Sequence, residues 1–486
     1  MNHKTPEQEG VSSVNIKKYI DILEEHQLST HNMIMMRGEN IFFEKYWEPF
    51  GPEFLHRMYS VTKSVVSLAV GFVIQEGLLN LDDKIVDYFE EESQVPQVDE
   101  NVKVQTIRNM LMMSTAKAPN GWTHDDDRVR CYFKNENPSR KPGEFFEYDT
   151  NSSFVLCALV ERLTGMSLMD YMRKKLFDKI GVSKEAYCLK CPGGHSWGDS
   201  ALLCTPRDLL LIARFVMNKG RWNGEQILNE SYIEEATSKL IETQSGEQVH
   251  FDTHGYGYQI WRTYDNSFMF NGMGCQFAIC VPEKDMIFIY NGDNQGHEGA
   301  QDIVIENFFK LIVRQAEDMP LIENLEGQEI LRAPMKLMCA QGKGYSELQE
   351  KIHGMVFKMQ PNPMNITEFS LHFSEEICYL SYINAQGSKS LPFGMLANAF
   401  DVFPQEGYYD QVGGEATKGH FYRCATSAAW LTEKKLHLKV QVIDKYFGRM
   451  DIVLDFADEE NVEMNITKTA EFFFDEYCGS AIGRKC

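Results

Sequence analysis

The chain has 486 residues, of which 43% are hydrophobic and 24% are charged, a balance that excludes a disordered or fibrous protein. Acidic residues outnumber basic residues by 70 to 48, so the formal net charge is -22 at pH 7. Because such a surface repels phosphate backbones and anionic lipids, we expect neither a nucleic-acid partner nor a membrane partner.

The amino-terminal sequence MNHKTPEQEGVSSVNIKKYI lacks the apolar core of a secretory signal. No apolar run reaches the roughly eighteen residues of a membrane-spanning helix. The 12 cysteines are scattered along the chain, which is typical of free thiols in a reducing compartment. These features predict a cytoplasmic protein.

One pair of cysteines, Cys188 and Cys191, has C-x-x-C spacing. A zinc or redox role is a weak hypothesis here, because no second pair follows at a matching distance. Two free thiols flanking a loop explain the spacing better. We therefore expect no metal and no cofactor.

The first predicted elements are a helix and a β-hairpin. Residues 13–26 carry apolar side chains at helical spacing, and residues 31–47 read as two strands around a turn at residues 37–40. A nearly continuous apolar helix is predicted from about residue 60 to residue 76, where Gly77 ends it. Mixed helices and loops follow to about residue 250.

Strands return between residues 268 and 292, on either side of a turn at 282–285. A helix from about residue 301 to residue 316 ends this unit. The order of elements predicts an α+β fold, in which helices flank an antiparallel sheet and a helical subdomain is inserted.

After about residue 330 the sequence alternates in short strands, most clearly at residues 435–442. We therefore predict two domains. Residues 1–325 form the mixed α+β domain, and residues 326–486 form a separate all-β domain without a concentrated catalytic set.

Two Ser-x-x-Lys matches and one Gly-x-Ser-x-Gly match compete for the role of nucleophile. Ser60 opens the apolar helix, and Lys63 lies on the same helical face, where its amine can reach the hydroxyl. The unpaired N–H groups of the first turn would also stabilise negative charge beside Ser60. The alternative, an ordinary capping serine followed by a surface lysine, fits poorly with so apolar a helix.

The other two serines have less suitable surroundings. Ser114 follows a predicted helix, where the backbone presents carbonyl groups, the wrong polarity for an oxyanion. Ser196, in Gly-His-Ser-Trp-Gly, resembles the nucleophile elbow of an α/β-hydrolase. That elbow requires a buried parallel strand leading into the serine, whereas Pro192 and Gly193 interrupt the chain just before it.

Three segments together resemble the class C β-lactamase-like serine hydrolases, which include penicillin-recognising enzymes, esterases, D-aminopeptidases and 6-aminohexanoate-dimer hydrolases. RMYSVTKSVVSLAVGFVIQEG, around Ser60, resembles their first motif. PGEFFEYDTNSSFVLCALVERLTG places Tyr148 on their catalytic tyrosine. FNGMGCQFAICVPEKD places Phe270-Asn271-Gly272 on their Lys/His-x-Gly triplet. The resemblance covers roughly residues 1–320 and implies a β-lactamase/transpeptidase-like fold.

The resemblance implies a serine hydrolase that works through an acyl-enzyme. Ser60 would be the nucleophile, and Lys63 and Tyr148 would form a coupled base pair. The backbone N–H groups of Ser60 and Met273 would bind the oxyanion. Substrate would lie against the residues at the second and third motifs, which are Thr150, Phe270, Asn271, Gly272 and Met273.

Two departures from the family pattern bear on the substrate. The usual Tyr-x-Asn is Tyr148-Asp149-Thr150, and Phe270 stands where the family has a cation. A penicillin or peptide carboxylate would lose its partner at residue 270. We therefore expect a small ester or uncharged amide as the substrate, and the sequence leaves the oligomeric state open.

Two other functions stay as alternatives, a catalytically silent ligand-binding or sensor module on the same fold, and an α/β-hydrolase that uses Ser196. The intact set of Ser60, Lys63 and Tyr148 argues against a silent module. An aromatic set is equally consistent with an acyl pocket and with core packing; its members are Trp122, Tyr256, Tyr258 and Trp261.

Overall fold

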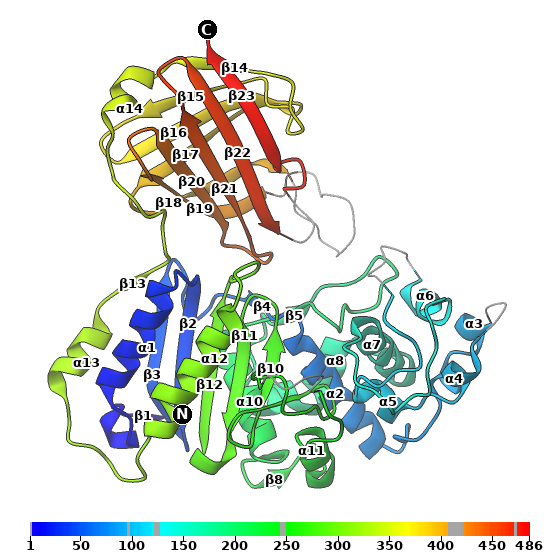
Figure 1. Ribbon diagram of the computed structural model, residues 1–486. Coiled ribbons are helices and arrows are strands. Elements are labelled where there is room, and N and C mark those ends of the chain that lie inside the picture. Colours follow the sequence, from blue (N-terminus) through cyan, green and yellow to red (C-terminus); the bar gives the residue numbers. More distant parts are fainter. Residues whose placement is uncertain are drawn as a thin grey trace. The chain divides into compact units, whose positions relative to one another are not determined.

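The computed structural model describes residues 2–94, 98–120, 127–243, 249–406, 419, 421–470 and 474–486. The chain divides into two compact units, Met1–Lys336 and Leu337–Cys486 (Figure 1). Helix α13 (Leu325–Arg332) and strand β13 (Met335–Lys336) belong to the first unit, because they contact α1 and β3. The assignment of residues 1–325 and 326–486 as independently folding domains stays a prediction.

A largely antiparallel sheet forms the centre of the first unit. Its strand order is β1 (Asn2–His3), β3 (Asn40–Glu48), β2 (Thr30–Arg37), β12 (Met286–Gly292), β11 (Gln276–Val281), β10 (Ser267–Gly272) and β9 (Trp261–Thr263). Only β1 and β13, which pair with β3, run parallel to their neighbour in the described part of this sheet. The hairpin expected at residues 31–47 is β2 and β3, and β2 joins the second expected hairpin through β12. The stretch 268–281, expected as one strand, is instead two antiparallel strands, β10 and β11, because a turn at residues 273–275 separates them.

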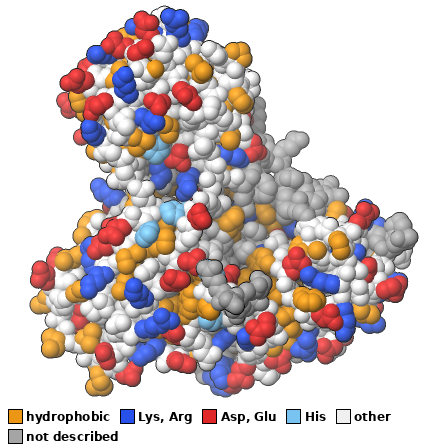
Figure 2. All heavy atoms as spheres, viewed as in Figure 1, with side chains coloured by type: hydrophobic (Ala, Val, Ile, Leu, Met, Phe, Trp, Pro, Cys, Tyr) orange, Lys and Arg blue, Asp and Glu red, His pale blue; other side chains and the backbone are white. Residues whose placement is uncertain are grey.

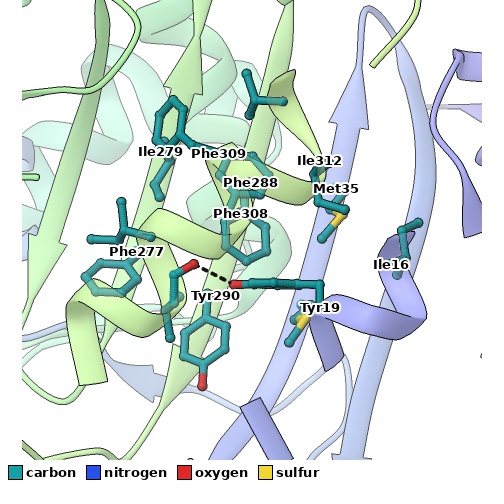
Figure 3. Packing of buried hydrophobic residues seen from close by; sticks show 14 of the residues in the cluster. Ile16, Tyr19, Met35, Phe277, Ile279, Phe288, Tyr290, Phe308, Phe309 and Ile312 are labelled. Atoms are coloured by element: carbon teal, nitrogen blue, oxygen red, sulfur yellow. Dashed lines mark hydrogen bonds between the residues drawn. The ribbon is translucent and has the colours of Figure 1, made fainter. Parts of the chain in front are cut away.

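Helices α1 (Ser13–Glu25) and α12 (Ala300–Leu311) cover one face of this sheet (Figure 1). Apolar side chains at helical spacing on α1 pack against alternate residues of the strands, since neighbouring side chains of a strand point to opposite faces. The ring of Phe288 stacks on Phe308 of α12, and the Tyr19 hydroxyl donates a hydrogen bond to the Val304 carbonyl at 2.9 Å (Figure 3). This layer is the main hydrophobic core of the unit.

The opposite face of the sheet contacts α2 (Val61–Gln75) and α10 (Pro206–Met217), and α2 also packs against α7 in a helical region. The other helices are α3 (Glu90–Ser93), α4 (Glu100–Lys103), α5 (Ile107–Leu111), α6 (Arg128–Phe133), α7 (Thr150–Thr164), α8 (Leu168–Met172), α9 (Asp178–Ile180) and α11 (Glu230–Ala236). Short strands form two small sheets, β4 (His56–Arg57), β6 (Leu202–Cys204) and β5 (Tyr187–Cys188), and β7 (Arg221–Trp222) with β8 (Glu225–Gln226). Single helical turns are η1 (Glu7–Glu9), η2 (Ile85–Tyr88), η3 (Arg173–Phe177), η4 (Pro282–Lys284) and η5 (Val313–Gln315).

In its described residues, the second unit is a ten-stranded sheet with one short helix, α14 (Glu347–Ile352). Its strand order is β17 (Gly387–Met395), β16 (Ile377–Asn384), β15 (Glu368–Phe373), β14 (Val356–Met359), β23 (Gly479–Lys485), β22 (Asn461–Ala470), β21 (Gly448–Phe456), β20 (Lys435–Val442), β19 (Phe421–Trp430) and β18 (Ala399–Glu406). A further pairing of β17 with β19 curls the sheet back on itself. The strict alternation at residues 435–442 corresponds to β20, whose even-numbered side chains are buried.

The α/β-hydrolase alternative for Ser196 is wrong, because the central sheet of the described chain is not a parallel, doubly wound sheet. No single helix in the described ranges is long and apolar enough to cross a membrane, although the bent pair Thr150–Thr164 and Leu168–Ile180 passes that test by length and composition. On the face drawn in Figure 2, basic side chains are interspersed with acidic ones.

Candidate active site

Ser60 stands at the N-terminus of α2, a helix whose side chains are buried from Val61 to Val73. Ser60 occupies the N-cap position, yet its side chain makes no capping hydrogen bond to the backbone. It is also only half-buried. The Ser60 hydroxyl is therefore not an ordinary helix cap, which was the alternative considered from the sequence. Its oxygen does not bond to the helix backbone and can bind another partner.

The residue before Ser60 has an unusual backbone conformation. Tyr59 is a left-handed residue with φ of 46°, although it has a large side chain that is 1% exposed. Left-handed backbone costs an L-residue about 1–2 kcal/mol, so the surrounding packing holds this bend in place. Such strain commonly occurs at functional sites, and here it sets the direction in which the chain enters α2.

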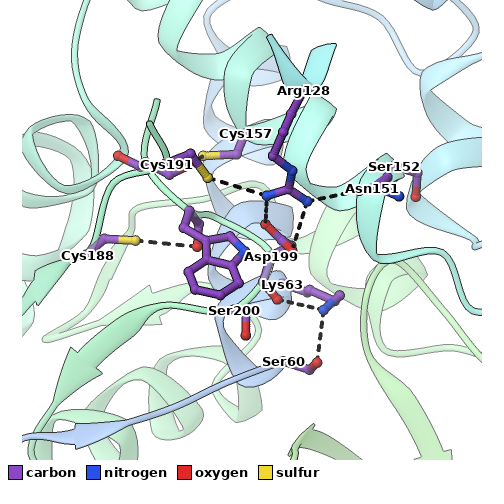
Figure 4. Close-up of polar contacts among 12 residues, drawn as sticks. Ser60, Lys63, Arg128, Asn151, Ser152, Cys157, Cys188, Cys191, Asp199 and Ser200 are labelled. Atoms are coloured by element: carbon purple, nitrogen blue, oxygen red, sulfur yellow. Dashed lines mark hydrogen bonds and ion pairs between the residues drawn. The ribbon is translucent and has the colours of Figure 1, made fainter. Parts of the chain in front are cut away.

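Lys63 is buried beside Ser60, with only 1% of the residue exposed. Its Nζ lies 2.9 Å from Ser60 Oγ and 2.6 Å from the Asp199 carbonyl oxygen (Figure 4). A surface lysine would have its amine in water. Here the amine is held between a hydroxyl and a carbonyl, one helical turn from Ser60.

Tyr148 lies next to the same amine, since Lys63 Nζ is 5.2 Å from the centre of the Tyr148 ring. Another neighbour of the ring is Trp261 of β9, which stacks on it with ring centres 5.8 Å apart and an angle of 19°. Within the described residues, the Tyr148 hydroxyl has no hydrogen-bond partner. The structure thus brings Ser60, Lys63 and Tyr148 together around one amine.

Asp149 fixes the start of helix α7 immediately after Tyr148. Its carboxylate accepts hydrogen bonds from the backbone N–H groups of Asn151 and Ser152, at 3.0 and 3.3 Å. Burial nevertheless raises the pKa of Asp149 to about 6, because the carboxylate is 2% exposed and the hydrogen bonds only partly offset its lost hydration. The residue after Tyr148 is therefore a structural cap, and Thr150 becomes the first residue of α7.

We expect Asp149→Asn to stabilise the protein at neutral pH. A pKa raised on folding contributes stability below pH 4, and that contribution is lost as the pH rises through about 6. Asparagine caps helices as well as aspartate does, and it carries no charge to bury. Chemical denaturation should give the variant a free energy of unfolding about 1–3 kcal/mol above wild type at pH 7.5, and a much smaller gain at pH 4. If the difference in free energy of unfolding between the variant and wild type did not change with pH, it would contradict a raised pKa of Asp149.

The third motif runs along β10 and its turn. Gly272 faces the start of α2, because a Cβ built on it would lie 2.3 Å from the Met58 carbonyl oxygen. Side chains alternate along a strand, so Phe270 shares this face and is fully buried. Asn271 lies on the other face, where its amide donates to Gln301 of α12 at 3.5 Å. The structure thus brings Phe270 and Gly272 toward α2 but not the Asn271 side chain.

Two backbone N–H groups near this point are open. Met273 follows β10 in the turn to β11, and it is 37% exposed. Neither the Met273 N–H nor the Ser60 N–H donates a hydrogen bond to any described residue. Both groups are therefore available to an acceptor from outside the chain.

The aromatic residues that the sequence suggested as an acyl pocket do not all lie together in the structure. Trp261 contacts Tyr148, and Tyr256 packs edge-on against Trp261 with centres 4.9 Å apart. Tyr258 instead donates its hydroxyl proton to Glu235 at 2.7 Å, away from these rings. Trp122 lies outside the described residues. Trp261 and Tyr256 thus support the Tyr148 ring.

Neither competing serine has its hydroxyl bonded to a lysine amine within the part of the chain that the structure describes. Ser114 is buried after α5 and donates its hydroxyl proton to the Asn109 carbonyl, while Lys117 donates to the Asn137 carbonyl at 2.8 Å. Ser196 is 2% exposed and lies in the loop between β5 and β6, where its N–H donates to Glu161 at 3.2 Å. Neither hydroxyl is presented at a helix N-terminus.

Of the C-x-x-C cysteines, Cys188 is the last residue of β5, and Cys191 lies in the loop after it, which also contains Ser196. Burial raises the pKa of the Cys188 and Cys191 thiols, which keeps them protonated at neutral pH. Cys191 Sγ is 3.4 Å from Nη1 of Arg128. No group of three or more His, Cys, Asp or Glu side chains is arranged to hold a metal ion within the residues described.

Sequence reasoning missed Asp199 and Arg128. Asp199 contributes its carbonyl oxygen to Lys63, and its carboxylate pairs with Arg128 (Figure 4). Asp199 lies 136 residues from Lys63 in the chain, directly after the Gly-x-Ser-x-Gly match, which gives no reason to pair it with Lys63. A backbone carbonyl has no sequence signature, so only tertiary structure could identify this contact.

Comparison with known proteins places this chain in a family. A family model described as Beta-lactamase matches residues 16–304, more than half of the chain. The 6-aminohexanoate-dimer hydrolase of Paenarthrobacter ureafaciens is 23% identical over 281 residues, or 54% of this chain and 71% of that protein. An uncharacterized protein of Alkalihalophilus pseudofirmus is 24% identical over 278 residues, covering 52% of this chain and 75% of that protein.

Two solved structures share the fold at 14% sequence identity. A putative β-lactamase from Bacteroides dorei has a TM-score of 0.51 and covers 62% of this chain and 98% of that one. The octameric penicillin-binding protein homologue from Pyrococcus abyssi has a TM-score of 0.50, covering 96% and 99%. These likenesses confirm the predicted β-lactamase/transpeptidase-like α+β fold with a C-terminal β domain. The chain belongs to the Beta-lactamase family, whose members include serine hydrolases.

Proposed function

We propose that the protein is a serine hydrolase that forms an acyl-enzyme on a small ester or amide. Ser60 is the nucleophile, and Lys63 and Tyr148 are its base pair. One observation carries the proposal: the amine of a lysine that is 1% exposed contacts the hydroxyl of Ser60 at 2.9 Å. Serine needs such a neighbouring base, because its hydroxyl is a weak nucleophile until its proton is removed.

In the proposed reaction, Ser60 Oγ attacks the substrate carbonyl carbon while its proton passes to the Lys63–Tyr148 pair. Collapse of the tetrahedral intermediate breaks the ester or amide bond, and the pair returns the proton to the leaving alcohol or amine. A water molecule then attacks the acyl-enzyme with the same pair as base, which releases the acid and restores Ser60. General acid–base help of this kind typically contributes about 100- to 10,000-fold.

The oxyanion of the intermediate is proposed to lie between the N–H groups of Ser60 and Met273. Three features support this position. Both N–H groups lack a donor contact to the described residues. The Ser60 N–H belongs to the positive end of α2. Gly272 allows β10 to approach the Met58 carbonyl more closely than any side chain would permit.

Gly272→Ala tests this close approach. The added Cβ would lie 2.3 Å from the Met58 carbonyl oxygen, and rigid backbone cannot yield as a flexible side chain does. We expect a loss of about 1–3 kcal/mol in the free energy of unfolding, and about a hundredfold lower kcat because Met273 moves away from Ser60. Gly51→Ala is the control, since nothing lies within 4 Å of its Cβ position. Wild-type kcat in Gly272→Ala would contradict the oxyanion assignment.

Two observations favour an ester or uncharged amide as the substrate. Phe270 is fully buried and uncharged where the family has a cation, so a substrate carboxylate has no partner at this position. Trp261 beside Tyr148 offers an aromatic surface. The relative from Paenarthrobacter ureafaciens is by its name a hydrolase of an aminohexanoate dimer, which supports an amide bond as a target but not the absence of charge, because such a dimer ends in a carboxylate. Thr150 completes the proposed substrate-binding residues, whereas the predicted role of Asn271 is dropped because its side chain lies on the opposite face of the sheet, against Gln301.

A fluorophosphonate probe tests the function directly, because it forms a stable bond only with an activated serine. We expect one adduct per chain, mapped by peptide mass spectrometry to Ser60. Short-chain nitrophenyl esters and amino-acid amides should be turned over faster than a chromogenic cephalosporin. Absence of any adduct would instead favour the silent ligand-binding or sensor module, and an adduct on another serine would overturn the assignment of Ser60.

A further inference from the structure

The buried pair of Arg128 and Asp199 lies next to the Lys63 amine, but it belongs to no motif. The guanidinium of Arg128 meets the Asp199 carboxylate with N–O distances of 3.3 and 3.4 Å (Figure 4). Both side chains are almost completely buried, at 1% and 0% exposed. An ion pair removed from water to this degree gives little net stability, because the lost hydration offsets the attraction. Its presence therefore calls for a role other than general stability.

The contacts of the pair point toward Lys63. Asp199 contacts both Arg128 and Lys63. Its carboxylate pairs with Arg128, and its backbone carbonyl accepts a hydrogen bond from Lys63 Nζ at 2.6 Å. The neighbouring residue, Ser200, is held as well, because Arg57 Nε donates to its carbonyl at 3.2 Å. Two buried arginines thus fix successive residues of the loop that joins the short strands β5 and β6.

The carbonyl of Asp199 has a stereochemical consequence for the amine. A neutral amine has two N–H groups and one lone pair. When one N–H is bonded to the Asp199 oxygen, rotation about the last carbon–nitrogen bond is restricted. The lone pair can then be held toward Ser60 Oγ, 2.9 Å away. Catalytic groups lose much of their effect when displaced by about 1 Å, so the position of this carbonyl matters to the rate.

We propose that Arg128 and Asp199 are positioning residues, which hold the Asp199 carbonyl where it orients the Lys63 amine toward Ser60. Neither residue touches the substrate. The inference rests on the proposed function, because orientation of Lys63 has a kinetic effect only if Ser60 is the nucleophile. Arg128 also donates to Asn151 Oδ1 at 2.9 Å, which ties the loop to the beginning of α7.

The test compares Asp199→Asn with Asp285→Asn. Asp285 also pairs with a buried arginine, Arg214 of α10, away from Lys63, although the Asp285 side chain is 54% exposed. We measure the rate of fluorophosphonate labelling at Ser60, and kcat and KM for a nitrophenyl ester. Asp199→Asn should lower the labelling rate and kcat at least about tenfold with little change in KM. Asp285→Asn should leave the labelling rate, kcat and KM near their wild-type values, even if both variants melt at a lower temperature.

A double-mutant cycle separates positioning from general damage. If Asp199 acts through Lys63, Asp199→Asn should cause no further loss of labelling in a Lys63→Ala background. A further loss there would overturn the proposal, and so would labelling of Asp199→Asn at the rate of Asp285→Asn. If Asp199→Asn does not fold, the double variant Arg128→Met with Asp199→Leu takes its place. Removing both charges leaves no unpaired charge in the protein interior. Full labelling of Ser60→Ala would instead refute the proposed function itself.

Discussion

Replacing Ser60 with alanine is expected to lower ester turnover at least about 10,000-fold, because removal of a nucleophile leaves only the contribution of binding and the oxyanion site. The variant should fold normally. The Ser60 hydroxyl makes no capping hydrogen bond to α2, so the change in unfolding free energy should stay within about 0.5 kcal/mol. Turnover of a nitrophenyl ester, with thermal unfolding measured in parallel, checks both statements.

Ser114→Ala and Ser196→Ala are the matched controls for this result. Ser114 occupies the second Ser-x-x-Lys match, and Ser196 occupies the Gly-x-Ser-x-Gly match. Both are buried and neither contacts a lysine amine. Each control should retain turnover within a few-fold of wild type. If Ser60→Ala retains turnover while either control loses it, the nucleophile has been misassigned.

Lys63→Met is expected to reduce kcat by about 100- to 10,000-fold, which is the usual contribution of a general base. Methionine fills nearly the same volume on the apolar helix α2, so the core should stay packed. The variant should also keep its stability, because the buried amine of Lys63 contacts a hydroxyl and a carbonyl rather than a carboxylate. Steady-state kinetics with the ester that the wild type prefers, together with a denaturation curve, provides the measurement.

Lys117→Met is the control for this prediction. Lys117 has the same Ser-x-x-Lys spacing, but its amine donates to the Asn137 carbonyl and lies 3.5 Å from Asp99. The Lys117→Met variant should therefore have a somewhat lower free energy of unfolding and an unchanged kcat. A Lys63→Met enzyme that retains wild-type kcat would show that Tyr148 or water alone removes the proton from Ser60.

Local patterns predicted those parts of the fold that depend on neighbouring residues in the chain. The apolar run after Ser60 became α2, the two hairpins became neighbouring strands of one sheet, and the alternation at residues 435–442 became β20. Side-chain periodicity reports burial directly, since a helix or strand buries one face at a fixed repeat. The final predicted helix was less accurate, because α12 ends at Leu311 and a separate turn follows it.

The sequence by itself determined the spacing of Ser60 and Lys63, since residues three apart on a helix share a face. Tertiary structure decided what surrounds that pair. It placed the ring of Tyr148 beside the amine, turned Asn271 to the opposite face of the sheet, and supplied the Asp199 carbonyl. These contacts join segments 30 to 136 residues apart and include a backbone group that every residue possesses, so no local pattern encodes them.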